Sequence, residues 1–159
     1  MGLTHDLLLT DDNILVPLYL RFPGASRTGR VETVVSTLDI MPTILDFLGI
    51  DPAQHVPYPI QGRSLLPLIE GARDESWLER RVRVDNRLLF QDRRTTALRG
   101  WRHKYLFHHD TGQEALYDLA SDPLEQRNLL EAPPAPETQA VLESFRRTFE
   151  EDEARAREF

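Results

Sequence analysis

Residues 95–119 read TTALRGWRHKYLFHHDTGQEALYDL, and this stretch decides the fold of the C-terminal half. It holds three short runs of β-branched, aromatic and aliphatic residues, separated by polar turns that contain glycine. The turns fall at Arg99-Gly100-Trp101 and Asp110-Thr-Gly112, where glycine suits the tight connections of hairpins. Two shorter runs upstream, Val82-Arg-Val-Asp85 and Leu88-Leu-Phe90, have the same character. The pattern predicts a small antiparallel sheet.

Helical signals follow this predicted sheet. Asp122-Pro-Leu-Glu125 combines an acidic capping residue, a proline and a glutamate in the order typical of a helix start. The proline-rich stretch 132–136 interrupts that helix. Residues 137–156 then carry apolar side chains at helical spacing, namely Val141, Leu142, Phe145 and Phe149. We therefore expect a terminal amphipathic helix that covers the sheet.

The N-terminal half predicts a different arrangement. Residues 14–21 form an apolar run that ends before a proline–glycine pair, as a buried strand followed by a turn does. Asp39 fits the N-cap of a helix over about residues 40–48, which ends at a glycine. A loop rich in proline follows, and a break near residues 71–77 marks the boundary between two lobes. The whole chain is expected to have an α+β fold.

Composition limits the classes of function. The chain has 159 residues and a net charge of -7, which argues against nucleic acid or an anionic membrane surface as its partner. It has no apolar run long enough to span a bilayer. It also has no cysteine, so the sequence offers neither a disulfide nor a thiolate metal site.

Three polar clusters are candidate sites, and each has a plainer explanation. Thr10-Asp11-Asp12-Asn13 offers oxygen ligands for a hard cation, but consecutive residues rarely converge on one ion, which favours a solvated or capping cluster. His108-His109-Asp110 looks like a ligand trio, but neighbours on a strand point to opposite faces. Trp101-Arg-His-Lys-Tyr105 mixes basic and aromatic residues, yet strand alternation explains it better at this net charge. Arg63 is expected to hold its loop by hydrogen bonds.

Four segments in a fixed order resemble the C-terminal part of the sulfatase family, within the alkaline-phosphatase-like superfamily. They are VPLYLRFPG at 16–24, VVSTLDIMPTILDFLGI at 34–50, QGRSLLPLI at 61–69 and LYDLASDPLEQRNL at 116–129. The resemblance implies that residues 1–75 are the end of a large α/β sulfatase-like domain. Residues 76–159 are then a small antiparallel-sheet lobe with a terminal helix. It also implies a partner surface, filled by the N-terminal sulfatase domain or by self-association.

The resemblance implies a substrate-binding role for one residue of this sequence. Counting back from Val16-Pro17, His5 falls at the basic position that contacts the sulfate ester in the family. A cation there stabilises negative charge on the ester oxygens as the bond breaks. Thr4 stands where the family has a glycine before the basic residue.

The catalytic parts of the family are missing from this sequence. In intact members, a formylglycine nucleophile and a divalent cation, commonly calcium, carry out the hydrolysis of a sulfate ester. The sequence has no Cys/Ser-x-Pro-x-Arg nucleophile motif and none of the paired metal aspartates. The resemblance therefore implies a C-terminal fragment of a sulfuric ester hydrolase that is not catalytic alone and holds no cofactor of its own.

Two alternatives stay open. The parent could be a phosphodiesterase or phosphonate-ester hydrolase of the same superfamily, because sulfate and phosphate esters present similar tetrahedral oxyanions. The chain could also be a non-catalytic module that binds a partner. The nucleophile motif in the sequence encoded upstream of Met1 would distinguish them.

Overall fold

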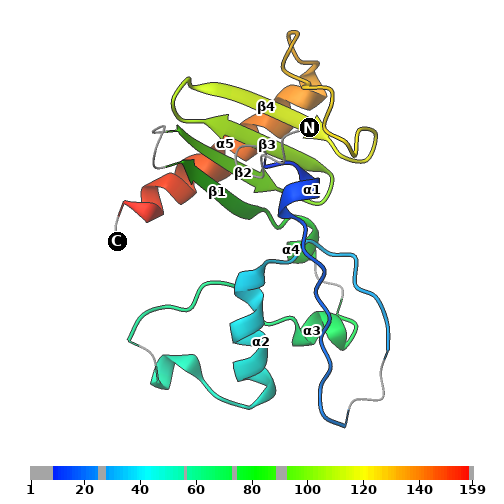
Figure 1. Cartoon of the computed structure of the whole chain (residues 1–159), viewed down its shortest axis with the longest axis vertical. Coiled ribbons are helices and arrows are strands. Elements are labelled where there is room, and N and C mark those ends of the chain that lie inside the picture. The colour runs from blue at the N-terminus through cyan, green and yellow to red at the C-terminus, as the bar shows by residue number, and fades with distance from the viewer. Residues whose placement is uncertain (1–8, 25–27, 56, 73–74, 89–92, 158–159) are drawn as a thin grey trace. The chain divides into compact units, whose positions relative to one another are not determined.

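The structure, a computed structural model, describes residues 9–24, 28–55, 57–72, 75–88 and 93–157. They fall into two compact units, which are drawn in Figure 1. Unit 1 comprises the described parts of Met1–Tyr19 and Arg83–Phe159, and unit 2 comprises those of Leu20–Val82. The mixture of helices with a small antiparallel sheet confirms the predicted α+β fold. The domain boundary at residues 75 and 76 stays a prediction.

Unit 1 is built on a four-stranded sheet with the strand order β1-β2-β3-β4 (Figure 1). The strands are β1 (Val82–Leu88), β2 (Arg93–Arg99), β3 (His103–His108) and β4 (Gln113–Asp118). Antiparallel pairing places Tyr105 opposite Leu98 on one side and opposite Leu116 on the other. Of the two upstream runs, Val82–Leu88 forms a single strand, and residues 89 and 90 lie outside the described part.

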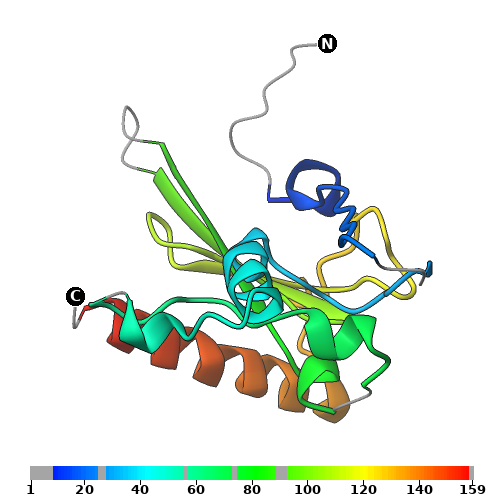
Figure 2. The same cartoon turned by 90° about the horizontal axis from the view of Figure 1, so that it is seen from below.

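One face of the sheet is covered by the long helix α5 (Pro136–Ala156), as Figures 1 and 2 show. Leu98, Tyr105 and Leu116 project from this face and form a buried cluster with Leu142 and Phe145 of the helix. These are the apolar positions that alternation along the strands and helical spacing predict. The terminal helix is confirmed. Among the helices that the structure describes, none is long and apolar enough to cross a membrane.

The opposite face of the sheet packs against the N-terminal segment of unit 1. Ala97, Leu106 and Ala115 form a buried cluster with Leu9, and Ile14 packs against it. The segment forms a short helix, α1 (Asp11–Ile14), and residues 15–22 continue in an irregular path. The strand predicted over 14–21 is therefore wrong, because a strand forms only by pairing with a neighbour and this segment pairs with neither edge of the described sheet.

The region after β4 also departs from its prediction. Residues 122–125 form a turn instead of a helix start. Both carboxylate oxygens of Asp122 accept backbone N–H groups, at 3.1 Å from Gln126 and 2.8 Å from Arg127. Glu125 has a positive φ of 55°. The capping residue was recognised correctly, but its side chain closes a loop rather than opening a helix.

In the part that the structure describes, unit 2 contains three short α-helices and two 3₁₀ turns besides the start of β1. The helices are α2 (Ile40–Phe47), α3 (Leu66–Ile69) and α4 (Glu75–Leu78). The 3₁₀ turn η1 (Thr37–Asp39) leads directly into α2, and η2 (Pro52–Gln54) follows it. Ser36 caps η1, and Asp39 returns a hydrogen bond to the backbone of Ser36, so the two form a capping box. Asp39 occupies the predicted N-cap position of α2, but its side chain makes no capping hydrogen bond to that helix.

Candidate functional site

Asp11 is the centre of a charged cluster on the α1 face of unit 1. Its Oδ1 lies 3.1 Å from Lys104 Nζ, and its Oδ2 lies 2.9 Å from Arg99 Nη2. Lys104 is fully buried and reaches Glu125 Oε1 at 2.9 Å and Oε2 at 2.8 Å. Two carboxylates thus face two cations, which balances the charge of a site largely removed from water. We call Asp11, Arg99, Lys104 and Glu125 the Lys104 cluster.

The Lys104 cluster changes the interpretation of Thr10-Asp11-Asp12-Asn13. Asp11 is neither solvated nor a cap, because both of its carboxylate oxygens are paired with cations. The amide of Asn13 donates to the hydroxyl of Thr10 at 3.0 Å. Among the described residues, no group of three or more His, Asp or Glu side chains could hold a metal ion. The segment is an anchored helix start.

Asp39 organises unit 2 in a comparable way. Its buried carboxylate accepts two hydrogen bonds from Arg80 and one from the backbone N–H of Arg63 at 2.8 Å. Burial raises the pKa of Asp39, but the hydrogen bonds from Arg80 and the backbone outweigh it, so the pKa lies below the usual value. The guanidinium groups of Arg63 and Arg80 lie 4.1 Å and 5.2 Å from the ring of Trp77. Arg63 also donates to Ser76, which confirms its predicted structural role.

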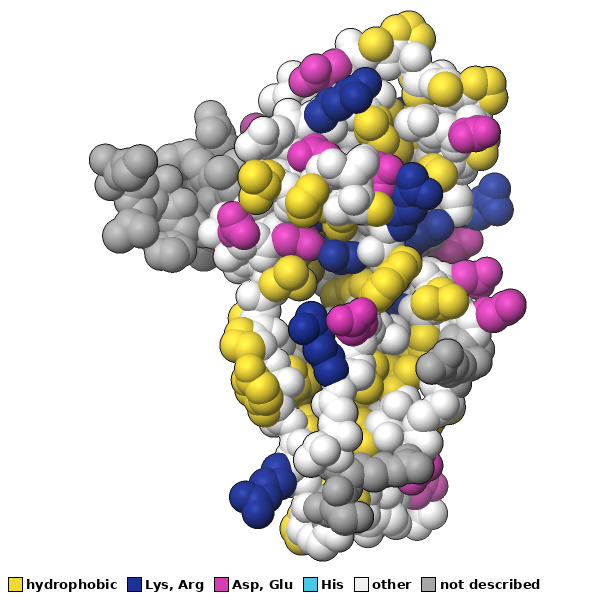
Figure 3. Space-filling view, turned by 90° about the vertical axis from the view of Figure 1, so that its right-hand side faces the viewer, with side chains coloured by type: hydrophobic (Ala, Val, Ile, Leu, Met, Phe, Trp, Pro, Cys, Tyr) yellow, Lys and Arg dark blue, Asp and Glu magenta, His cyan; other side chains and the backbone are white. Residues whose placement is uncertain are grey.

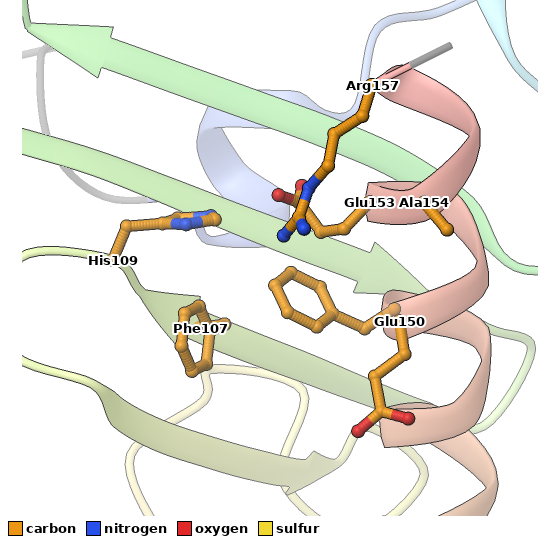
Figure 4. A pocket seen from close by; sticks show the side chains of 7 residues that line it. Phe107, His109, Glu150, Glu153, Ala154 and Arg157 are labelled. Atoms are coloured by element: carbon orange, nitrogen blue, oxygen red, sulfur yellow. The ribbon is translucent and has the colours of Figure 1, made fainter.

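A half-open pocket of about 430 Å³ lies between β3 and the end of α5 (Figure 4). Phe107 and His109 line it from the sheet side, and Phe149, Glu153 and Arg157 line it from the helix. The rings of Phe107 and Phe149 are 4.7 Å apart, and His109 meets Phe107 edge-on at 4.9 Å. The pocket is therefore a cleft over mutually packed rings and paired charges.

The two adjacent histidines point to different partners, as their position at the end of a strand predicts. His108 Nδ1 contacts the hydroxyl of Thr95 at 3.1 Å, and His109 Nε2 contacts that of Thr96 at 2.9 Å. Burial, with the charge of Arg94, lowers the pKa of His109 below its usual value. The two imidazole rings are therefore engaged by different hydroxyl groups.

His5, the substrate-binding residue that the resemblance implies, lies outside the described residues, and its role stays a prediction.

The Lys104 cluster was not predicted from the sequence because its members are distant in the chain. The only local signal was a lysine within a strand, Lys104, whose neighbours Tyr105 and Leu106 are buried. The view in Figure 3 shows acidic and basic side chains interspersed with hydrophobic ones.

The fold and the order of its motifs define the C-terminal part of a sulfatase. Residues 2–153 match the family described as N-sulphoglucosamine sulphohydrolase, C-terminal, and the chain belongs to that family. The resemblance drawn from the four segments is thereby confirmed.

Individual relatives give the same result. A choline-sulfatase of Rhizobium meliloti (strain 1021) is 32% identical over 91% of this chain and 27% of its own length. An N-acetylglucosamine-6-O-sulfatase of Bacteroides thetaiotaomicron is 30% identical over 72% of this chain and 21% of its own. The solved structure of a 2-O GAG sulfatase superposes with a TM-score of 0.65 at 26% identity, covering 81% of this chain and 27% of that one. The chain thus spans about a quarter of the length of the relatives it matches.

Proposed function

We propose that this chain is the C-terminal part of a larger sulfuric ester hydrolase and that it supplies scaffold and substrate contacts, whereas the attacking group lies elsewhere. The observation that carries the proposal is the family match over residues 2–153 by a chain that spans about a quarter of each relative. The sheet and α5 of unit 1 are the rigid element of this scaffold, because strands and helix share one buried core.

The residues of this chain do not fit the cofactors that the family implies. Among the described residues no group of three or more side chains could hold a metal ion, and the sequence holds no Cys/Ser-x-Pro-x-Arg motif for conversion to formylglycine. Calcium and formylglycine therefore belong, in this proposal, to the part of the protein outside this sequence. The residues present would orient the substrate and exclude water, and His5 would contact the sulfate ester.

Exposed apolar side chains support a packing partner for the chain. In unit 1, Leu15 and Val16 are 62% and 61% exposed, although they follow a helix anchored to the sheet. In unit 2, the exposed side of α2 carries large apolar residues, namely Met41, Ile44, Phe47 and Leu48. Apolar side chains gathered in this way mark interaction surfaces. In this proposal the rest of the sulfatase domain covers them.

The test compares the 159-residue chain with the complete protein that its gene encodes, using a chromogenic aryl sulfate and calcium. We expect turnover by the complete protein and none by the chain, because positioning cannot replace a missing nucleophile. Metal-dependent turnover by the chain, well above a buffer blank, would overturn the proposal. A complete protein that hydrolyses a phosphodiester but no sulfate ester would favour the phosphodiesterase alternative, and one that hydrolyses neither would favour a partner-binding module.

A further inference from the structure

The two halves of α5 are held to the sheet in different ways. Leu142 and Phe145 of the first half are buried in the core cluster of unit 1. The residues of α5 that follow Phe145 include none that is buried. Phe149 is partly buried against the core, and Glu153, one turn further on, reaches arginines of the sheet. The last turns of α5 are therefore held mainly by one ring and one carboxylate.

Glu153 belongs to a group of four charged side chains whose charges balance. Arg83 of β1 and Arg94 of β2 both reach its Oε1, at 2.5 and 2.9 Å. The same two arginines also pair with Asp85, at 2.6 and 3.3 Å. We call Arg83, Asp85, Arg94 and Glu153 the Glu153 cluster. Since two carboxylates face two guanidinium groups, the cluster has no net charge.

Thr96 connects His109 to the Glu153 cluster through a completely buried hydroxyl group. The hydroxyl donates to Asp85 Oδ1 at 2.6 Å and lies 2.9 Å from His109 Nε2. A hydroxyl has one proton, and an ionised carboxylate can only accept. The proton of Thr96 is therefore committed to Asp85, so the hydroxyl oxygen accepts from His109. This assigns the hydrogen of the neutral imidazole to Nε2 and leaves Nδ1 as the nitrogen that can take up a proton.

The surroundings of His109 oppose that second proton. Its ring meets Phe107 edge-on at 4.9 Å and lies 5.7 Å from the ring of Phe149 (Figure 4). A proton on Nδ1 would add an uncompensated positive charge beside the neutral Glu153 cluster. Burial, with the charge of Arg94, accordingly lowers the pKa of His109. The charged groups around the ring are Arg83 and Asp85 on β1, Arg94 on β2, and Glu150, Glu153 and Arg157 at the end of α5.

We propose that His109 is a proton-sensitive latch for the last turns of α5: the neutral imidazole allows residues 150–156 to stay closed against the sheet, and the imidazolium favours their release. In the released state water reaches the ring, and its pKa returns to about 6.5. The closed state is therefore favoured above that pH, and the advantage is lost as pH falls through the lower pKa of the closed state. The first half of α5 stays in place, because Leu142 and Phe145 remain in the core.

Amide hydrogen exchange of the 159-residue chain at pH 7.5 and pH 5, corrected for the intrinsic rate at each pH, tests the latch. Protection of residues 150–156 should fall at pH 5 by at most about 30-fold, the limit set by a released-state pKa of 6.5, whereas β2, β3 and β4 keep theirs. His109→Gln keeps an N–H donor for Thr96 but does not titrate, and it should abolish this change. His108→Gln is the matched control: it removes the adjacent histidine, which contacts Thr95, and should retain the change.

The carboxyl groups of the same turns give the result that would overturn the inference. Burial raises the pKa of Asp152, so this residue can also take up a proton on acidification. A pH response that persists in His109→Gln belongs to such a group and not to the histidine. An equal loss of protection throughout α5 and the sheet would also overturn the latch, because it marks global unfolding.

Nitrogen-15 NMR of the imidazole rings tests the same inference without any variant. The unmodified chain should show the hydrogen of neutral His109 on Nε2 and a pKa below 6.5. A hydrogen on Nδ1, or a pKa of 6.5 or higher, would overturn the inference.

Discussion

Arg80 and Asp39 form a two-pronged ion pair inside unit 2. Arg80 Nη1 lies 2.7 Å from Asp39 Oδ2, and Nη2 lies 2.7 Å from Oδ1, while the Asp39 side chain is completely buried. The same carboxylate also accepts the backbone N–H groups of Ser36 and Arg63. One side chain therefore links the turn before α2, the Gly-Arg-Ser loop and the residues leading into β1.

Replacing Asp39 by Ala should destabilise unit 2 by about 3–5 kcal/mol, because it leaves a mostly buried Arg80 without its partner. The measurement is urea unfolding in a Trp101→Phe background, so that the buried Trp77 reports on this unit. The control is Asp51→Ala, which removes an exposed cap of η2 and should cost about 1 kcal/mol. Equal losses for the two variants would contradict the prediction.

Gly62 should tolerate no side chain. A Cβ at this position would lie 2.4 Å from the carbonyl oxygen of Leu38, and φ is +96°. Gly71 has the same φ, but a Cβ there meets open space among the described atoms. Gly62→Ala and Gly71→Ala therefore share the conformational cost of about 1–2 kcal/mol. The Gly62 variant should lose about 1–3 kcal/mol more through the clash, which thermal unfolding of the two variants would measure.

Asp85 should make stability depend on pH. Burial raises its pKa, but hydrogen bonds from Arg83 and Thr96 and the charges of Arg83 and Arg94 outweigh it and lower the pKa to about 2. A carboxyl with a depressed pKa stabilises the fold above its unfolded pKa of about 3.9, and that contribution disappears as pH falls through the folded value. Because the side chain is 39% exposed, water screens the pairs and the effect is modest.

The measurement for Asp85 is the difference in unfolding free energy between wild type and Asp85→Asn. It should be constant above about pH 5 and shrink as pH falls from about 4 to about 2. Using the difference removes the contribution of the other carboxyl groups. A difference that stays constant down to pH 2 would show that the pairs of Asp85 with Arg83 and Arg94 do not form in solution.

The isolated chain should self-associate through α2. Ile44 and Leu48 lie one turn apart and are 48% and 59% exposed. Sedimentation velocity should show dimers or larger species at micromolar concentrations, and Ile44→Ser/Leu48→Ser should shift them toward monomer. The control is Glu143→Ser on the exposed side of α5. A monomer for the unmodified chain, or equal association for both variants, would contradict this prediction.

The sequence predicts those elements that local patterns specify. Alternation over residues 95–119, with glycines at the turns, predicts β2, β3 and β4, and the spacing of Leu142, Phe145 and Phe149 predicts α5. The strand predicted over residues 14–21 and the helix start predicted at 122–125 are wrong. The apolar run and the capping aspartate are present, but they make other contacts than those of a strand or a helix. An apolar run becomes a strand only beside an edge, and a capping aspartate closes a loop equally well.

The ion pairs could not be predicted, because they join residues that are far apart in the sequence. Asp39 meets Arg80 across 41 residues, and Asp11 meets Lys104 across 93. A single sequence shows the charges but not which of them become buried together. The chemistry of the candidate site was therefore inferred from the resemblance alone, and its proposed contact, His5, is the residue that experiment must test first.

Replacing His5 by Ala in the complete protein should lower kcat/KM by roughly 10², the loss seen when one donor to a developing oxyanion is removed. His5→Lys should retain more activity than His5→Ala, because a cation remains beside the ester. In the isolated chain the same substitution should leave the thermal midpoint unchanged, since the proposed role is substrate contact. His55→Ala, which removes an exposed histidine of unit 2, is the control and should keep full activity. Unchanged kinetics for His5→Ala would show that the count back from Val16 is wrong, and the sulfate contact would then have to come from another residue.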